Sequence, residues 1–383
     1  MKRLVYAFLI CALCAVSCVY PYDAEIGGGS GDLVIEGDIF VGAMSEFALS
    51  TLLPVSASNA SRAEMAHPYG VLWVEDSNGI RYYGVAQGDG VYSVDMTDAK
   101  PGPEYRLRVD ISGGRSYASS WMHGAGTCYA DDLTCSISAD RKKLQLLLSM
   151  HSDEESSRHF RYRYSEDWEF HTIKNAVMYY DPNAHSVEYY SSGDVTNYFC
   201  WNHEGSRGIN LATTEDMTGT ELIDFPIRAY GNNDRRFSYI YRIILEIYSV
   251  SEESYDYYEH LKEMSEYDGS LFAPTPSEVR GNIRCLDDDD EIVYGYVAVA
   301  EPARIERYFY SKDLKFFVDP DDRISYEDKT FPEYEWYMAY MTGWRPYYNK
   351  TMVGVLWTNA RCVDCRKLGG TKQRPENWIN EDR

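Results

Sequence analysis

Residues 105–121 have the sequence YRLRVDISGGRSYASSW, which determines the fold class of this chain. Every second residue from Tyr105 to Ile111 is apolar, and a Gly113-Gly114 pair follows after one serine. Strict alternation puts the apolar side chains on one face of a β-strand, and paired glycines permit a tight turn into the next strand. The stretch therefore predicts a β-hairpin with one buried face.

The preceding part of the chain repeats this pattern. Residues 70–85, GVLWVEDSNGIRYYGV, place two apolar runs on either side of an Asn78-Gly79 turn, and residues 33–41, LVIEGDIFV, also alternate. Several short strands joined by such turns over about 90 residues are typical of a β-sandwich. We expect residues 33–120 to form an immunoglobulin-like or transthyretin-like β-sandwich.

Residues 121–383 are also rich in strand-like segments. They include KLQLLLSM (143–150), HFRYRYSEDWEF (159–170), AVMYY (176–180), EIVYGYVAVA (291–300) and RIERYFY (304–310). We expect the last two segments to pair across a turn at Glu301-Pro302. One prominent helix is predicted where Ser251 is a favourable N-cap, Glu252 and Glu253 suit the positive end of the helix dipole, and Gly269 ends the pattern. The fold class is therefore mainly β, an N-terminal sandwich followed by a larger β-rich domain over residues 121–383.

The N-terminus predicts export. Two cations, Lys2 and Arg3, precede an apolar run over residues 4–16, which is the pattern of a signal peptide ending at residue 17. The run is shorter than the roughly 20 residues that a membrane-spanning helix needs. The small residues before Cys18 suit an ordinary signal peptidase as well as the lipoprotein one, but a cysteine at the new N-terminus favours lipidation. We expect acyl chains on Cys18, with secretion without lipid as the alternative.

Residues 18–32 contain a Gly-Gly-Gly-Ser-Gly run and no periodic pattern, so we expect a flexible tether between the lipid and the fold. Acyl chains hold a protein on a membrane without embedding it. The chain has 37 basic and 60 acidic residues, a formal charge of −23. Such a charge repels phosphate backbones, which excludes nucleic acid as a partner.

No catalytic motif is recognisable in the sequence. It contains no Gly-x-Ser-x-Gly, Walker-type or His-Glu-x-x-His pattern, so we assign no catalytic, cofactor-binding or metal residue and expect a protein that is not an enzyme. Glu166, Asp167 and Glu169 are the residues of one alternative, a hydrolase that uses paired carboxylates. The His203-Glu204 pair is expected to be a surface feature, and so are the acidic runs at 287–291 and 319–322, for which calcium binding is the alternative.

Six cysteines remain after the signal peptide and Cys18, and an even number in an exported protein predicts disulfides. They are Cys128, Cys135, Cys200, Cys285, Cys362 and Cys365. We expect the first two to pair across the short YADDLT segment. The other four allow three pairings, which the sequence leaves open, and the alternative of a zinc site would need reduced thiolates outside the cytoplasm. Cys362 and Cys365 are therefore expected to form a C-terminal disulfide clamp, bonded to each other or to Cys200 and Cys285.

Several stretches together resemble one family. They are LVIEGDI (33–39), GVYSVDM (90–96), YRLRVDISGGRSYAS (105–119), FRYRYSEDWEF (160–170), FCWNHEGSRGINL (199–211), GSLFAPTPSEVRGNI (269–283), VYGYVAVA (293–300) and CVDCRKLGGTKQRPENW (362–378). In this order they resemble the Bacteroidota lipoproteins known only as domain of unknown function 4249.

The resemblance implies an outer-membrane lipoprotein, often encoded beside a TonB-dependent transporter, and supports Cys18 as the lipid site. It supplies no catalytic residue. We therefore expect a cell-envelope protein that binds a small ligand, a peptide or a partner as an accessory to such a transporter. The sequence does not determine whether it lies on the periplasmic or the cell-surface face of the membrane. The alternatives are a structural or adhesive surface protein and, third, the hydrolase.

Overall fold

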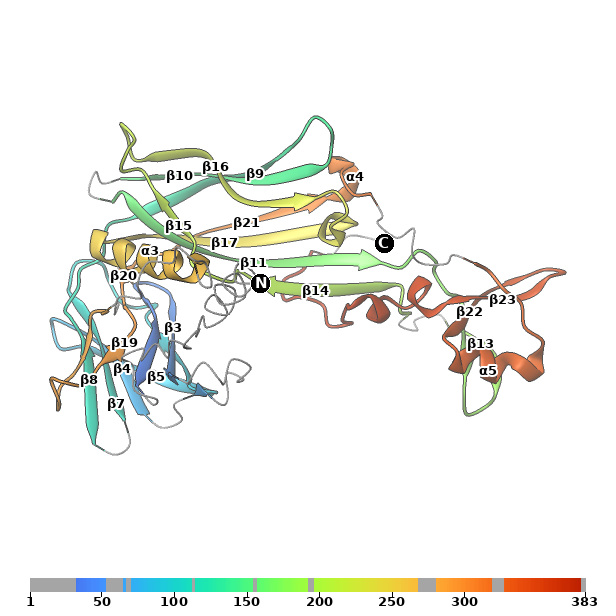
Figure 1. The fold of residues 1–383 in the computed structure, drawn as a ribbon, viewed down its shortest axis with the longest axis horizontal. Coiled ribbons are helices and arrows are strands. Elements are labelled where there is room, and N and C mark those ends of the chain that lie inside the picture. The colour runs from blue at the N-terminus through green and yellow to red at the C-terminus, as the bar shows by residue number, and fades with distance from the viewer. Residues whose placement is uncertain are drawn as a thin grey trace, which may run out of the picture.

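The computed structural model describes residues 32–52, 65–66, 70–111, 114–153, 157–191, 196–267, 280–318 and 327–379. The chain is mainly β, as predicted, and elongated, with an N-terminal sheet at one end, two central sheets, and a small lobe at the other end (Figure 1). The signal peptide, Cys18, the tether up to residue 31 and the acidic run at 319–322 lie outside the described residues. Among the residues described, no helix combines the length and apolar character needed to cross a membrane.

The N-terminal sheet confirms both predicted hairpins. The hairpin around Asn78-Gly79 pairs β4 (Gly70–Asp76) with β5 (Arg81–Gly88), and the second hairpin pairs β7 (Tyr105–Ile111) with β8 (Arg115–Ser119). Tyr105, Leu107 and Val109 are buried while the residues between them are not. Its strands are β1 (Leu33–Gly37), β3 (Met44–Thr51), β4 (Gly70–Asp76), β5 (Arg81–Gly88), β6 (Val91–Asp95), β7 (Tyr105–Ile111) and β8 (Arg115–Ser119), with β18 (Ile283–Cys285) and β19 (Val293–Tyr294) at the two ends.

The two end strands come from residues that the sequence analysis assigned to the second domain. Ile283, Val293 and Val297 pack into the same core as Ile35 and Leu107. The core of this part is thus built from two distant stretches of chain, while the boundary at residue 120 and the immunoglobulin-like character stay predictions.

The expected pairing of residues 291–300 with 304–310 is wrong. β19 instead runs parallel to β1, and β20 (Val299–Ala300) runs parallel to β2 (Ile39–Phe40). Gly295 permits this course, because a Cβ atom there would lie 1.8 Å from the carbonyl oxygen of Ile35. Residues 293–300 therefore belong to the N-terminal part, and β21 (Ala303–Tyr310) pairs with β17 (Ile240–Val250) of the central part.

Two central sheets enclose the second core. One contains β16 (Glu221–Gly231), β10 (Lys143–Ser152) and β9 (Cys128–Ile137); the other contains β14 (Phe199–Gly205), β11 (His159–His171), β17 (Ile240–Val250) and β21, with β15 (Leu211–Thr213) beside β11. Alternate residues of β10 pack against β11 and β17. The predicted helix is confirmed as α3 (Glu252–Tyr267), and the Ser251 hydroxyl accepts a hydrogen bond from the Ser254 amide at 3.3 Å.

The small lobe, here called the distal lobe, consists of residues 172–191 and 327–364. It contains β12 (Met178–Asp181), β13 (Ser186–Tyr189), α5 (Trp336–Met341), β22 (Trp344–Lys350) and β23 (Gly354–Asn359) around Trp357. The short helices are α4 (Ser311–Leu314) and the 3₁₀ turns η2 (Arg235–Phe237), η3 (Glu333–Glu335), η4 (Ala360–Cys362) and η5 (Cys365–Leu368).

The cysteines do not pair as expected. Cys128 and Cys135 lie on the single strand β9 and form no disulfide. Seven residues of extended chain separate two Cα atoms by about 23 Å, whereas a disulfide needs less than about 7 Å. The expected local disulfide is therefore wrong. The YADDLT segment contains no residue that forces a turn, so the chain stays extended and keeps the two cysteines apart. Among the described cysteines, a disulfide joins Cys200 to Cys365, with the Cα atoms 5.7 Å apart.

Candidate functional site

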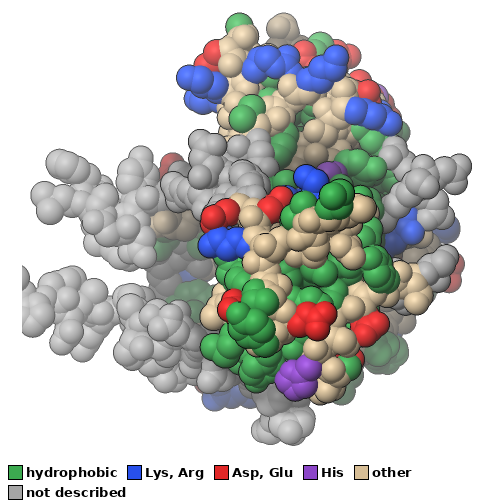
Figure 2. Space-filling view, turned by 90° about the vertical axis from the view of Figure 1, so that its right-hand side faces the viewer, with side chains coloured by type: hydrophobic (Ala, Val, Ile, Leu, Met, Phe, Trp, Pro, Cys, Tyr) green, Lys and Arg blue, Asp and Glu red, His purple; other side chains and the backbone are tan. Residues whose placement is uncertain are grey.

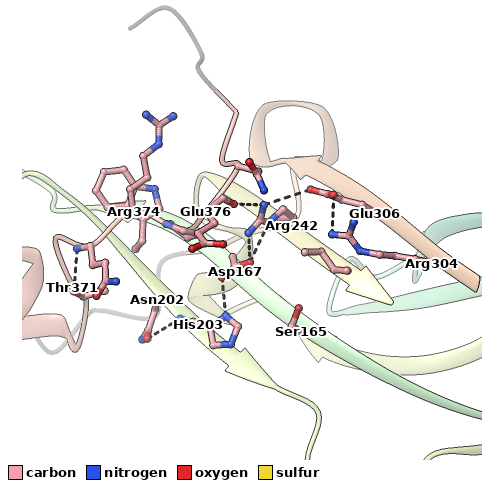
Figure 3. A pocket seen from close by; sticks show the side chains of 15 residues that line it. Ser165, Asp167, Asn202, His203, Arg242, Arg304, Glu306, Thr371, Arg374 and Glu376 are labelled. Carbon is pink, nitrogen blue, oxygen red and sulfur yellow. Dashed lines mark hydrogen bonds and ion pairs between the residues drawn. The ribbon is translucent and has the colours of Figure 1, made fainter. Parts of the chain in front are cut away.

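A cleft of about 480 Å³ lies over the outer face of the sheet formed by β14, β11, β17 and β21. The C-terminal segment, residues 371–377, forms its other wall (Figure 3). Most of the lining side chains are charged or carry amide and hydroxyl groups. The cleft is therefore a polar site built on a rigid sheet.

Three residues in one row across the sheet form the floor. Asp167 on β11 lies opposite Arg242 on β17 and opposite His203 on β14. Nε and Nη2 of Arg242 donate to Oδ2 of Asp167 at 3.0 and 2.6 Å, and Nδ1 of His203 lies 2.8 Å from Oδ1 of the same carboxylate. The side chains of Asp167 and Arg242 are each 5% exposed, whereas that of His203 is 63% exposed. A buried ion pair thus fixes an exposed imidazole.

Arg242 also ties the C-terminal segment to the sheet. Its Nη1 donates to the carbonyl oxygen of Glu376 at 2.9 Å and lies 3.5 Å from the Glu306 carboxylate. Burial alone would lower the pKa of Arg242, but hydrogen bonds with Asp167 and Tyr308 outweigh it and raise the pKa above its ordinary value. The guanidinium is therefore a charged structural centre of the cleft.

The C-terminal motif explains why residues 371–377 lie here. Cys365 is bonded to Cys200 on β14, which is half of one pairing that the sequence left open, whereas Cys285 and Cys362 form no disulfide, so the expected clamp forms through Cys365 alone. A Cβ atom on Gly370 would lie 2.5 Å from the Cβ of Cys200 and 2.6 Å from the ring of Phe170. Only glycine allows the chain to pass so close to the disulfide, after which Thr371 pairs with Trp201 at the edge of the sheet.

The end of the motif is fixed by a buried carboxylate. The indole nitrogens of Trp201 and Trp378 both donate to Oε2 of Glu169, at 3.1 and 3.0 Å. Glu169 is 1% exposed. The segment between the disulfide and Trp378 is therefore held at both ends and arches over the cleft.

The three acidic residues around Trp168 are separated by the strand pleat. Asp167 and Glu169 face the cleft side, while Glu166 points into the core, where Tyr241 donates to it at 2.6 Å and Arg228 lies 3.0 Å away. Burial raises the pKa of Tyr241, and the Glu166 charge raises it further. Glu166 is thus separated from the cleft, whereas Asp167 lines it together with the carboxylates of Glu306 and Glu376, so the hydrolase alternative stays a prediction.

The other candidates have structural roles. Asp287 accepts from the Ser116 amide at 2.7 Å, and Glu291 binds Arg115 at 2.6 Å, so the acidic run at 287–291 holds strand β8. Cys285 lies in the N-terminal sheet, so the four cysteines of the zinc alternative do not meet. Within the described ranges, no group of three or more His, Cys, Asp or Glu side chains is placed to hold a metal ion.

Arg242, Arg304, Glu306 and the C-terminal lining residues were not predicted from the sequence. One signal was available: Arg242 interrupts an apolar run at 240–245, and a charged residue in such a run indicates a buried partner. Its partner could not be named, because the strand register is set by the whole sheet.

A family model described as Domain of unknown function (DUF4249) matches residues 19–306. The match includes the three residues of the cleft floor and ends before the C-terminal motif with Cys362 and Cys365. No curated protein matches the chain.

Proposed function

The chain belongs to the DUF4249 family, and we propose that it is a lipid-anchored cell-envelope protein that binds a polar ligand in the cleft around Arg242. The N-terminal sequence supports the anchor, and the resemblance to Bacteroidota lipoproteins supports an outer-membrane location and a TonB-dependent transporter as the partner. The single observation that carries ligand binding is the cleft itself. Its volume of about 480 Å³ lies within the range of small-molecule sites, about 300–1,000 Å³.

The lining chemistry favours binding over catalysis. Both carboxylate oxygens of Asp167 are engaged, one by Arg242 and one by His203, so this group positions its neighbours instead of exchanging a proton. A proton-transfer catalyst needs a group that is free to gain or lose a proton at the reacting atom.

The same lining predicts the ligand's chemistry. Three guanidinium groups, of Arg242, Arg304 and Arg374, and three carboxylates line the cleft, so its formal charges balance. Amide groups of Asn202, Gln373 and Asn377 add donors and acceptors. A neutral or zwitterionic ligand with many hydrogen-bonding groups, such as a saccharide or a short peptide, matches this arrangement better than an anion or an apolar molecule.

Ligand binding is tested with the full chain and a panel of oligosaccharides and short peptides, by thermal shift and then by calorimetry. We expect Arg304→Gln to weaken binding of a hit by about tenfold, because a charge-assisted hydrogen bond contributes about 1.5–3 kcal/mol. The matched control is Arg81→Gln, since both arginine side chains are about half exposed and Arg81 lies in the N-terminal sheet. Equal affinity of the Arg304 variant and the wild type would contradict binding in this cleft.

The anchor is tested separately by replacing Cys18 with serine and fractionating the cell envelope. We expect the variant to leave the membrane fraction, because the acyl chains supply the membrane affinity at about 0.8 kcal/mol per buried CH₂. Cys14→Ser, a change inside the signal peptide, is the control and is expected to leave fractionation unchanged. Unaltered membrane association of the Cys18 variant would refute the lipid site.

A further inference from the structure

The distal lobe carries a concentration of exposed apolar side chains. It contains about one fifth of the described residues but eleven of the twenty-two exposed large hydrophobic side chains recorded among them. These eleven are Ile173, Val177, Tyr179, Tyr189, Tyr334, Tyr337, Met338, Met341, Tyr348, Met352 and Val353. We call them the lobe patch. Figure 2 views the molecule from this end and shows hydrophobic side chains gathered over the lobe.

The exposure is large and does not follow from packing needs inside the lobe. Tyr334 is 83% exposed, Met338 and Met341 are about 60% exposed, and Met352 at the turn between β22 and β23 is fully exposed. The lobe already has its own core around Trp357, Tyr180 and Ala339. The exposed apolar area of the patch therefore lowers solubility, which is the usual mark of an interaction surface.

The area of the patch is sufficient for a specific protein interface. Taking roughly 200 Å² for one fully exposed large side chain, the exposed fractions of the eleven residues amount to about 1,200 Å². A standard interface takes about 800 Å² from each partner. Tyrosine and methionine, which dominate the patch, are also the residue types enriched in such interfaces.

Charges around the patch indicate which partner it suits. Glu333 and Glu335 flank Tyr334 just before α5, whereas Lys350 ends β22 on the hairpin beyond α5, and all three are exposed. A surface that carries both acidic and basic side chains beside its apolar residues can complement itself across a two-fold axis. We propose that the lobe patch is the interface between two copies of this chain, joined end to end with their clefts and N-terminal sheets left free.

A lipid surface fits the patch less well. Membrane-binding surfaces pair apolar side chains with a basic rim, and here carboxylates lie directly beside the exposed aromatic ring of Tyr334. The formal charge of −23 opposes self-association at long range, but surface charges more than about 8 Å apart are largely screened at physiological salt. The charges on the central sheets and the N-terminal sheet lie away from the contact and therefore do not prevent the two copies from associating.

The proposal is tested in the native envelope with two differently tagged copies of the full chain in one cell. A photo-crosslinking amino acid replaces Met338 in one experiment and Ile223, exposed on β16 outside the lobe, in the control. We expect a crosslinked product that carries both tags from position 338 and none from position 223. The double variant M338E/M341E is expected to lower co-purification of the two tags at least about tenfold, because two carboxylates on each copy would be buried.

The control for that loss is V85E/I223E, which places the same charges on exposed side chains outside the lobe. Both double variants alter exposed residues, so an unchanged melting temperature shows that each is folded. Crosslinks from position 338 only to lipid or only to another protein would overturn the proposal, and so would co-purification that M338E/M341E leaves unchanged.

Discussion

At the scale of single residues, the pair formed by Asp167 and Arg242 holds the cleft together. Each side chain is 5% exposed, and removing one member of a buried ion pair leaves the other charge without its partner. We therefore expect Asp167→Asn to lower the free energy of unfolding by about 3 kcal/mol, measured by urea denaturation. It should also loosen His203 and residues 371–377, which depend on the same two side chains.

The same two strands provide a matched control for this prediction. Arg163 on β11 pairs with Glu246 on β17 at 2.6 Å, but the two side chains are 50% and 30% exposed. Solvent-exposed pairs contribute less than about 1 kcal/mol, so Glu246→Gln is expected to change stability little. If both variants had the same effect, burial would not be the reason for the importance of Asp167.

At the scale of elements, the disulfide between Cys200 and Cys365 fixes the C-terminal segment on β14. It spans 165 residues, and both cysteines are fully buried. Closing so long a loop restricts the unfolded chain, a contribution of about 3–5 kcal/mol in the chain-entropy description. We expect Cys365→Ala to lower the unfolding free energy by an amount in this range and to expose residues 371–377 to protease. Cys135→Ala, at a half-buried thiol outside the disulfide, is the control and should have a small effect.

The elements also show how far sequence reasoning extends. The hairpins at residues 70–88 and 105–119 and the helix α3 were predicted correctly, because alternation, turn residues and an N-cap act between near neighbours. The course of residues 293–300 and the partner of Cys365 were not predictable, because they depend on contacts with β1, β2 and β14, far away in sequence. The cleft was missed for the same reason: its floor is one row across three strands, and no local pattern reveals the register that aligns them.

At the scale of the whole molecule, one buried carboxylate joins the N-terminal part to the central sheets. Asp38 follows β1 and is 5% exposed. Nη1 of Arg161 on β11 lies 3.0 and 2.9 Å from its two oxygens, and the hydroxyl of Tyr248 on β17 donates to it at 2.9 Å. The guanidinium of Arg161 in turn lies 3.4 Å from the ring centroid of Tyr258 on α3. The N-terminal sheet, the central strands β11 and β17 and the helix α3 are thus linked through the carboxylate of Asp38.

This arrangement predicts that the two cores unfold together only while the Asp38 charge is present. Burial alone would lower the pKa of Arg161, but the Asp38 charge raises it above its ordinary value, so the guanidinium is charged in the folded protein. Asp38→Asn removes one charge and leaves the buried guanidinium uncompensated, which costs about 3 kcal/mol. We expect differential scanning calorimetry to show two transitions in this variant, because the N-terminal core and the central core are then weakly coupled. Asp95→Asn, at an exposed position of the same N-terminal sheet, should keep the wild-type profile. A single unshifted transition for Asp38→Asn would mean that the apolar contacts of β2 and β20 suffice to couple the two parts.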